Sequence, residues 1–298
     1  MSKSNTRDEK PTFREHIHNI RGQLALRDII SHDGILRSAP QMAPLTAYAL
    51  TIGLFFATGH ATGVYNAIGY LGGWIHVSQD PPAILVQGMI RQSGYIAFAL
   101  IVFVLTLHVL RIPRGNIAQP VLTKRSWKVF AVACLATFLG FGALAIISGG
   151  DSVAFPQPDD RSAIYSLSNV VDAFRAGITE EICLMALPVL FLRAARRPWT
   201  EIIIVLTVIR WSFHAYYGIP SLGLMIWAAA VILLFRYTCS ILPIIAEHIL
   251  FDLKFPAMGD TMPLIMGSLI AAAAIYGIYA VSNSIDPSPN NKRSKAAA

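Results

Sequence analysis

Long apolar runs recur along this chain of 298 residues, and they restrict its fold more than any other feature. A helix needs about 20 mainly apolar residues to cross a bilayer, because the hydrocarbon core is about 30 Å thick and a helix rises about 1.5 Å per residue. The runs do not alternate polar and apolar residues as membrane strands do. The sequence therefore predicts an all-α, polytopic transmembrane bundle with about eight spans. The predicted spans cover residues 41–58, 93–112, 127–148, 168–192, 199–217, 221–238, 240–254 and 262–282.

The composition agrees with this prediction. Only 14% of the residues are charged and 54% are hydrophobic, whereas about 25% are charged in a typical soluble domain. The formal net charge of +7 could indicate a nucleic-acid binder, but the Lys and Arg residues lie between the predicted spans. We therefore expect a lipid bilayer and no nucleic acid as partner. Cys134, Cys183 and Cys239 fall inside apolar runs, which argues against a disulfide framework or a paired-cysteine metal site.

The charges of the connections predict an orientation. Basic residues gather in 1–40, 111–128 and 193–197 and in the C-terminal tail, while the connection 59–90 has neither Lys nor Arg. Connections rich in Lys and Arg face the cytoplasm. Both termini are therefore predicted to be cytoplasmic, most simply in a bacterial inner membrane.

The same pattern divides the chain into consecutive segments without an internal repeat. Residues 62–78 are too polar for a further crossing and are predicted to form an interfacial or re-entrant piece. The segments are a basic cytoplasmic stretch (1–40), N-terminal transmembrane helices (41–160), a helical core with the ionisable residues (161–256), a last transmembrane helix (257–284) and a cytoplasmic tail (285–298).

Ionisable residues inside three predicted spans are the strongest functional signal. A charge at the bilayer centre costs about 2.5–3.5 kcal/mol on insertion scales, so each such residue needs a physical reason. These residues are Glu180, Glu181, Arg210, His214, Glu247, His248 and Asp252. Arg210 and His214 are four residues apart, as are His248 and Asp252, so each pair shares a helix face. Their similar depth predicts one polar cavity, in which a carboxylate can act as a general base.

Structural explanations exist for the same residues. A single buried histidine can simply hydrogen-bond two helices, and Arg210 can neutralise a glutamate. Asp172 and Arg175, three residues apart, are expected to form a surface pair. Three other histidines lie near loops or span ends and are expected to have structural or interfacial roles: His60, His76 and His108.

The ionisable motifs resemble those of the glutamic intramembrane endopeptidases, the family of CAAX prenyl proteases and bacteriocin-processing or immunity proteins (CPBP). The resemblance consists of a Glu180-Glu181 pair, His214 in the next span, and His248 with Asp252 four residues later. It covers residues 163–255, about a third of the chain. The resemblance implies a helical intramembrane hydrolase that needs no cofactor.

The resemblance also implies a role for each motif residue. Glu180 would be the general base, His214 would position the water, and Glu181 would orient His214 or the water. His248 would stand at the oxyanion, where one donor can contribute about 3–4 kcal/mol. An ionised Asp252 cannot donate a hydrogen bond, so it is either protonated or holds His248 in one tautomer; the second role is preferred.

The chain departs from the family motifs at two positions. The family has an arginine where this chain has Met185, and a phenylalanine where it has Arg210. One hypothesis is that Arg210 supplies from the fifth span the positive charge expected from the fourth. The other is that the site is degenerate and the protein is a non-catalytic homologue.

The sequence thus predicts an endopeptidase that acts on a membrane-associated peptide or protein. A divalent metal remains an alternative, since Glu, His and Asp side chains can hold an ion whose bound water attacks, although the chain has no His-Glu-x-x-His motif. Two other classes stay open. These are a membrane scaffold or immunity protein that uses the cavity without hydrolysis, and a proton-coupled transporter.

Overall fold

The described part of the chain is entirely helical in the computed structural model. It comprises residues 41–74, 82–112, 124–147, 163–215 and 219–253. Eight helices make up this part when the continuous run from Ala163 to Ala194 is counted as one. The elements are α3 (Pro44–Ala57), α4 (His60–Leu71), α5 (Pro82–Val109), α6 (Lys124–Ile147), α7 (Ala163–Thr179), the π-helix η2 (Glu180–Ala186), α8 (Leu187–Ala194), α9 (Trp199–Ser212), the 3₁₀ turn η4 (Ile219–Leu222), α10 (Gly223–Thr238) and α11 (Leu242–Asp252).

The first seven predicted spans each correspond to one of these helices or to the continuous run α7–η2–α8. The eighth, at 262–282, lies outside the described residues, as do the terminal segments 1–40 and 285–298. Residues 62–71 of the predicted interfacial piece belong to helix α4. By length and apolarity together, Ala83–Val109 is the one helix in the described ranges that could cross a membrane. Pro44–Ala57, Ser126–Gly140 and Gly223–Thr238 are apolar but shorter.

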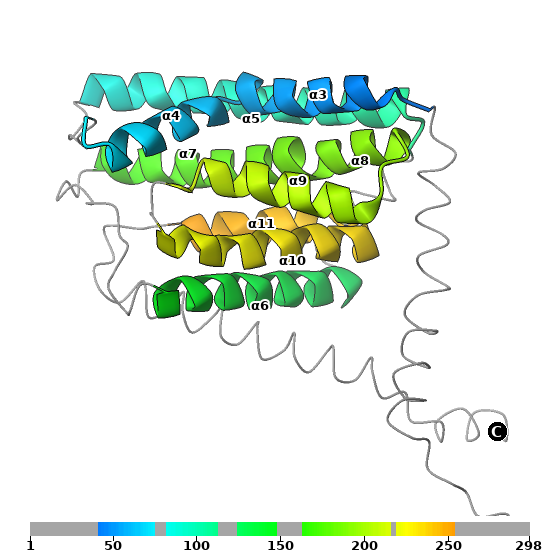
Figure 1. Cartoon of the computed structure of the whole chain (residues 1–298). Helices are drawn as coiled ribbons and strands as arrows, with labels where there is room; N and C mark the ends of the chain where they lie inside the picture. Colours follow the sequence, from blue (N-terminus) through cyan, green and yellow to red (C-terminus); the bar gives the residue numbers. More distant parts are fainter. Residues whose placement is uncertain (1–40, 75–81, 113–123, 148–162, 216–218, 254–298) are drawn as a thin grey trace, which may run out of the picture.

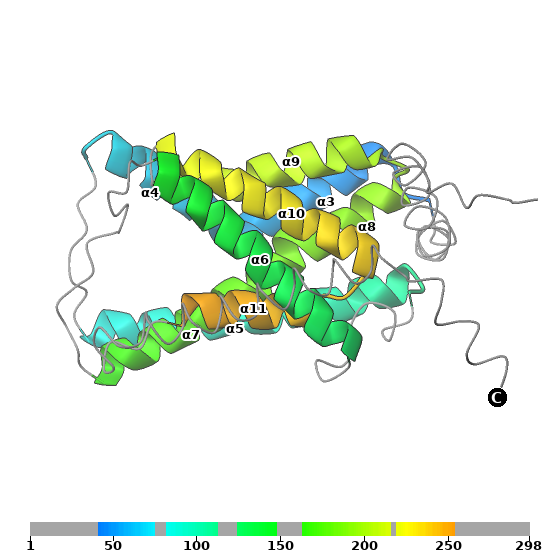
Figure 2. The ribbon, with the colours of Figure 1, turned by 90° about the horizontal axis from the view of Figure 1, so that it is seen from below.

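The helices stack in layers (Figure 1), and α6 crosses its neighbours obliquely (Figure 2). Helices α3, α4 and α5 form one layer, the run α7–η2–α8 and α9 lie next to it, α10 and α11 follow, and α6 covers the opposite side (Figures 1 and 2). The main contacts join α5 to α7, α7 to α11, α9 to α10, and α6 to both α10 and α11. The run α7–η2–α8 is therefore central, with neighbours on several sides.

The π-helix in the central run has a local cause in the sequence. Pro188 lies two residues after η2, near the start of α8. A proline inside a helix cannot donate the backbone hydrogen bond to the residue four positions earlier. A local π turn is one way in which a helix accommodates that loss. The wide turn begins at Glu180, so the irregularity coincides with the predicted site.

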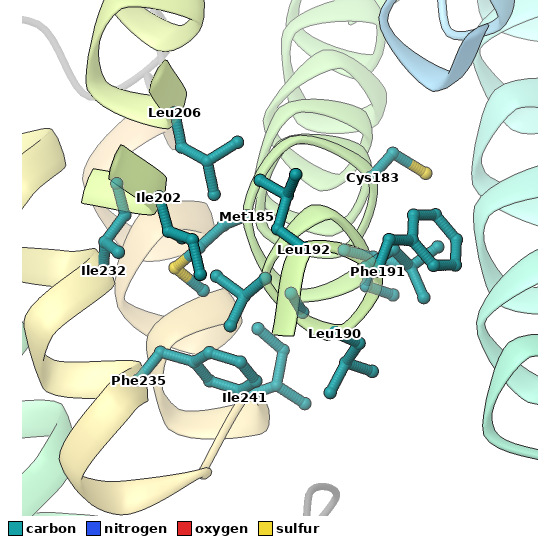
Figure 3. Close-up of a cluster of buried hydrophobic side chains, with 14 of the residues drawn as sticks. Cys183, Met185, Leu190, Phe191, Leu192, Ile202, Leu206, Ile232, Phe235 and Ile241 are labelled. Carbon is teal, nitrogen blue, oxygen red and sulfur yellow. The ribbon is translucent and has the colours of Figure 1, made fainter. Parts of the chain in front are cut away.

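A buried apolar cluster joins η2, α8, α9, α10 and the start of α11 (Figure 3). Met185 is fully buried in this cluster, together with residues such as Leu190, Ile202 and Phe235. The position where the family with similar motifs has an arginine is therefore a core position here.

Many large apolar side chains lie on the outside of the described bundle. Only 22% of the membrane-length apolar stretch in α5 is buried, and Ile90, Ile101 and Val109 of this helix are each more than half exposed. Soluble monomers rarely expose contiguous apolar surface of this kind. One side of α5, with Ala99, Phe103 and Leu107, packs in the interior, whereas most of its apolar residues lie on the outside of the described bundle.

Candidate active site

Close packing of α7 against α11 brings the glutamate pair to the histidine motif. Gly177 lies one turn before Glu180, and a Cβ at this position would be 2.4 Å from Cγ1 and 3.0 Å from the backbone nitrogen of Ile249. Only glycine allows the two backbones to approach this closely. His248 directly precedes Ile249, so this contact sets the distance between the glutamates and His248.

Glu181 forms a buried ion pair with Arg210. The Glu181 side chain is fully buried and Arg210 is 1% exposed. Arg210 Nη1 donates to Glu181 Oε2 at 3.1 Å, and Nη2 contacts the other carboxylate oxygen. The guanidinium also lies 4.1 Å from the ring centroid of Trp227 in α10. As proposed from the sequence, a positive charge from α9 thus meets the glutamate pair.

His248 lies between two carboxylates. Its Nδ1 is 2.7 Å from Glu181 Oε1, and its Nε2 is 3.4 Å from Asp252 Oδ2 one turn later in α11. The nearby Arg210 Nη2 is a donor only and cannot share a hydrogen bond with an Nδ1 that donates to Glu181. This geometry fits a ring that carries a hydrogen on each nitrogen. Asp252 contacts the ring nitrogen opposite Glu181, so Glu181 and not Asp252 holds Nδ1.

The carboxylate of Glu181 has other partners than those expected from the sequence. It was expected to orient His214 or the water, but it contacts Arg210 and His248. Glu181 is occupied by an ion pair and a histidine, so it can fix their positions. Glu180 is the member of the pair that faces the cavity.

Glu180 has three nitrogen atoms close by but just beyond hydrogen-bond distance. Its Oε1 is 3.7 Å from Nε2 of His60, and its Oε2 is 3.9 Å from both Arg210 Nη2 and His248 Nε2. Glu180 is 5% exposed, and its Oε2 has no hydrogen-bond partner among the described residues. A buried carboxylate oxygen without a partner is costly, and a water or substrate group can satisfy it here.

His60 belongs to the site, contrary to the structural or interfacial role expected from the sequence. It is 5% exposed and starts α4, directly after a tight turn in which Gly59 has φ = +79°. Thr58 Oγ1 donates to the Leu54 carbonyl at 2.7 Å and is 2.7 Å from His60 Nδ1. The hydroxyl has one hydrogen, so His60 Nδ1 must be the donor in the second contact. In neutral His60 the lone pair is then on Nε2, which points to Glu180.

His214 follows α9 and lies in the same cavity as Glu180. Its Nδ1 is 2.9 Å from the backbone carbonyl of Arg210, which can only accept, so Nδ1 is again the donor. Neutral His214 therefore also has its lone pair on Nε2. The centroid of its ring lies 6.5 Å from the ring centroid of Trp227, and the centroids of Trp227 and His248 are 5.4 Å apart. Both pairs of rings are arranged edge to face. The single indole of Trp227 thus packs against His214, His248 and Arg210.

A polar cavity of about 330 Å³ gives access to Glu180. This volume is at the lower end of small-molecule pockets. Residues from the turn before α4 and from α4, α5, α7 and the end of α9 line it, so both the N-terminal helices and the predicted core contribute. The lining residues are Thr58, Gly59, His60, Thr62, Gly63, Asn66, Arg91, Gln92, Tyr95, Asp172, Arg175, Glu180, Phe213 and His214.

The remaining predicted residues have defined places in the structure. Asp172 and Arg175 form the expected pair, with Arg175 Nε donating to Asp172 Oδ1 at 2.8 Å, and both also line the cavity. Glu247 points to α6, where it accepts a hydrogen bond of 2.7 Å from Thr137. His108 has no role in the cavity lining, and His76 lies outside the described residues.

A metal centre was an alternative for the same side chains. Within the described ranges, no three or more His, Cys, Asp or Glu side chains are grouped as ligands of a metal ion would be. The carboxylates of the cluster face arginine and histidine nitrogens, as in ion pairs.

No protein-family model matches the chain, and neither a curated protein nor a solved structure matches it. The resemblance to the glutamic intramembrane endopeptidases therefore depends on the motif residues and on the cluster that they form.

Proposed function

We propose that this chain is a membrane-embedded glutamic endopeptidase that hydrolyses a peptide bond of a membrane-associated peptide or protein. The observation that carries the proposal is the position of Glu180. Its carboxylate is buried at the wall of a polar cavity, 3.7–3.9 Å from nitrogens of three side chains. Carboxylates in this setting are typical general bases.

In the proposed reaction, Glu180 removes a proton from a water molecule in the cavity. The resulting hydroxide attacks the carbonyl carbon of the scissile bond and forms a tetrahedral intermediate with a negative oxygen. Glu180 then returns the proton to the amide nitrogen, the carbon–nitrogen bond breaks, and an amine and a carboxylic acid leave. One water is consumed, and Glu180 ends in its starting state.

Two histidines support the proton transfer. His60 and His214 each donate from Nδ1 to a fixed partner, so the Nε2 atom of each neutral ring can accept a hydrogen bond from the water. Their places in the cavity lining put them on the same side as Glu180. His214 keeps the role that the family resemblance implies, and His60 is a second candidate for the same task.

His248 is the proposed donor to the negative oxygen. Its Nε2 is 3.9 Å from Glu180, and its contact with Asp252 is 3.4 Å, which is longer than an ordinary hydrogen bond. A developing oxyanion can therefore compete with Asp252 for this hydrogen. Glu181 holds the opposite ring nitrogen, and Arg210 holds Glu181, so both act as positioning residues.

The membrane location is part of the proposal. An apolar α5 with largely exposed side chains supports lipid contact, as do the exposed apolar side chains on α3, α6 and α10. The Lys and Arg residues of the connections favour an orientation with both termini in the cytoplasm and the Glu180 cavity toward the opposite side of the membrane. A bacterial inner membrane is the simplest host.

Met185 favours a second candidate function, that of a non-catalytic membrane scaffold or immunity protein. The family arginine is replaced by a residue packed in the apolar core, so one part of the family motif is missing. Arg210 meets the glutamate pair from another helix, and we regard it as the replacement. A scaffold would keep its cellular phenotype after Glu180→Gln, whereas a protease would lose it.

Cleavage by the purified protein tests the proposal. Wild type, Glu180→Gln and His214→Ala are incubated with a quenched peptide library, with and without a chelator. Glu247→Gln is the matched control, because its amide oxygen can still accept the Thr137 hydrogen bond away from the cavity. We expect cleavage by wild type and the control alone, unchanged by the chelator. Equal cleavage by Glu180→Gln would refute the proposed role.

A further inference from the structure

Helix α5 forms one wall of the cavity and contributes a cation, Arg91, that has no role in the proposed reaction. Arg91 lies in the first half of α5 and lines the cavity together with Gln92 and Tyr95 of the same helix. Glu180 lines it from the π-helix η2. A ligand in the cavity can therefore contact Arg91 while its reacting bond lies at Glu180.

The other arginine of the cavity is already paired. Arg175 Nε donates to Asp172 Oδ1 at 2.8 Å, and Gln92 Nε2 donates to the same oxygen at 3.1 Å. Arg91, in contrast, has neither a hydrogen bond nor an ion pair with any residue that the structure describes. The lining thus includes a guanidinium, that of the exposed Arg91, without a carboxylate partner among the described residues.

The chemistry of this group restricts what it binds. A guanidinium presents a planar fork of N–H donors that matches a carboxylate with two parallel hydrogen bonds. Asp172 and Glu180 are also in the lining, and their negative charges disfavour a doubly charged phosphate more than a singly charged carboxylate. The volume of about 330 Å³ has room for a few peptide residues rather than a folded chain.

We propose that Arg91 binds a carboxylate of the substrate peptide and thereby places the scissile bond at Glu180. This inference rests on the proposed peptidase function and adds a substrate class, peptides with an anionic group close to the cleaved bond. The carboxylate has two possible sources with the same chemistry, a free C-terminus or an Asp or Glu side chain. Arg91 is a specificity residue and takes no part in the proton transfers.

The test uses four synthetic peptide pools of matched random sequence: free-acid or amidated at the C-terminus, each with or without Asp and Glu. Binding is measured on full-length Glu180→Gln in lipid nanodiscs, by mass spectrometry of the retained peptides, so no cleavage is needed. Arg91→Gln and Arg91→Lys are added to this background. The matched control is Arg111→Gln, which removes the same charge just beyond the opposite end of α5, at an exposed residue.

We expect the pool without any carboxylate to be retained about 10- to 100-fold less than the best acidic pool, the range for a charge-assisted hydrogen bond. Arg91→Gln should abolish this preference, Arg91→Lys should keep part of it, and Arg111→Gln should leave it unchanged. Two of the pools carry only one kind of carboxylate, either the free C-terminus or the Asp and Glu side chains. Comparison of these two pools shows which carboxylate Arg91 binds.

Two results would overturn the inference. One is equal retention of all four pools, and the other is an Arg91→Gln variant with the same preference as its parent. Cleavage rates separate this failure from that of the enzyme proposal. Hydrolysis that depends on Glu180 but ignores carboxylates refutes the role of Arg91 alone, whereas a carboxylate preference without hydrolysis by wild type refutes the peptidase alone.

Discussion

Gly177→Ala is expected to damage the candidate site from outside the cavity. The added methyl group would stand 2.4 Å from Ile249 Cγ1, 3.0 Å from the Ile249 nitrogen and 3.2 Å from the Ile245 carbonyl oxygen. The first contact is with the Cγ1 methylene, one bond from the branch point at Cβ, and the other two are on the backbone, so no flexible side-chain end can move away. Helix α11 must therefore shift by roughly 1 Å to reach ordinary van der Waals distance.

The free-energy change can be bounded from this geometry. Overpacking of a well-packed interior costs about 1–3 kcal/mol, and replacement of glycine by alanine in a helix returns about 1 kcal/mol. The net loss of stability is about 0–2 kcal/mol, so the protein still folds. A displacement of about 1 Å can lower a rate by about a hundredfold, and His248 lies next to Ile249. We expect a small drop in melting temperature and a large drop in cleavage rate.

The matched control is Gly94→Ala. Gly94 lies inside α5, and a Cβ at this position would meet no atom within 4 Å. The two variants have the same chemical change in a helix, but only one disturbs α11. Thermal unfolding in detergent and cleavage rates are measured for both. A Gly177→Ala variant as active as Gly94→Ala would refute the link between this contact and the site.

Three further predictions follow from the cluster. Arg210→Gln leaves Glu181 buried without its cation and should lower the unfolding free energy by about 3–5 kcal/mol. Adding Glu181→Gln to the same chain should restore most of this stability. A double variant as unstable as the single variant would contradict the ion pair. His60→Gln should lower kcat about a hundredfold with little change in the melting temperature, and an unchanged kcat would remove His60 from the mechanism. A chelator should leave the initial cleavage rate unchanged; a loss that added Zn²⁺ reverses would indicate a metal enzyme.

Periodicity and hydrophobicity were sufficient to predict the helices, because each long apolar run became a helix wherever the structure describes it. The spacing of His248 and Asp252 also predicted their contact, since residues four apart share a helix face. The pairing of Arg210 with a glutamate followed from the cost of an unpaired buried charge.

His60 could not be placed by the same reasoning. It is separated from Glu180 by about two fifths of the chain, and no periodic pattern links a turn after α3 to the middle of another helix. The available signal was local: a threonine and a glycine directly before a histidine, at the end of an apolar run, indicate a tight turn that holds the ring. The close contact at Gly177 was equally hidden, because glycine is also common in membrane helices for other reasons.

Transfer of water oxygen into the product tests directly whether Glu180 activates a water molecule for hydrolysis of a peptide bond. The purified wild type and Glu180→Gln are incubated for a single turnover with a cleavable peptide in heavy-oxygen water, and the products are weighed by mass spectrometry. We expect a new carboxyl terminus that carries one heavy oxygen with wild type and no product with Glu180→Gln. An intact peptide after incubation with wild type, or labelled product formed equally by Glu180→Gln, would contradict it.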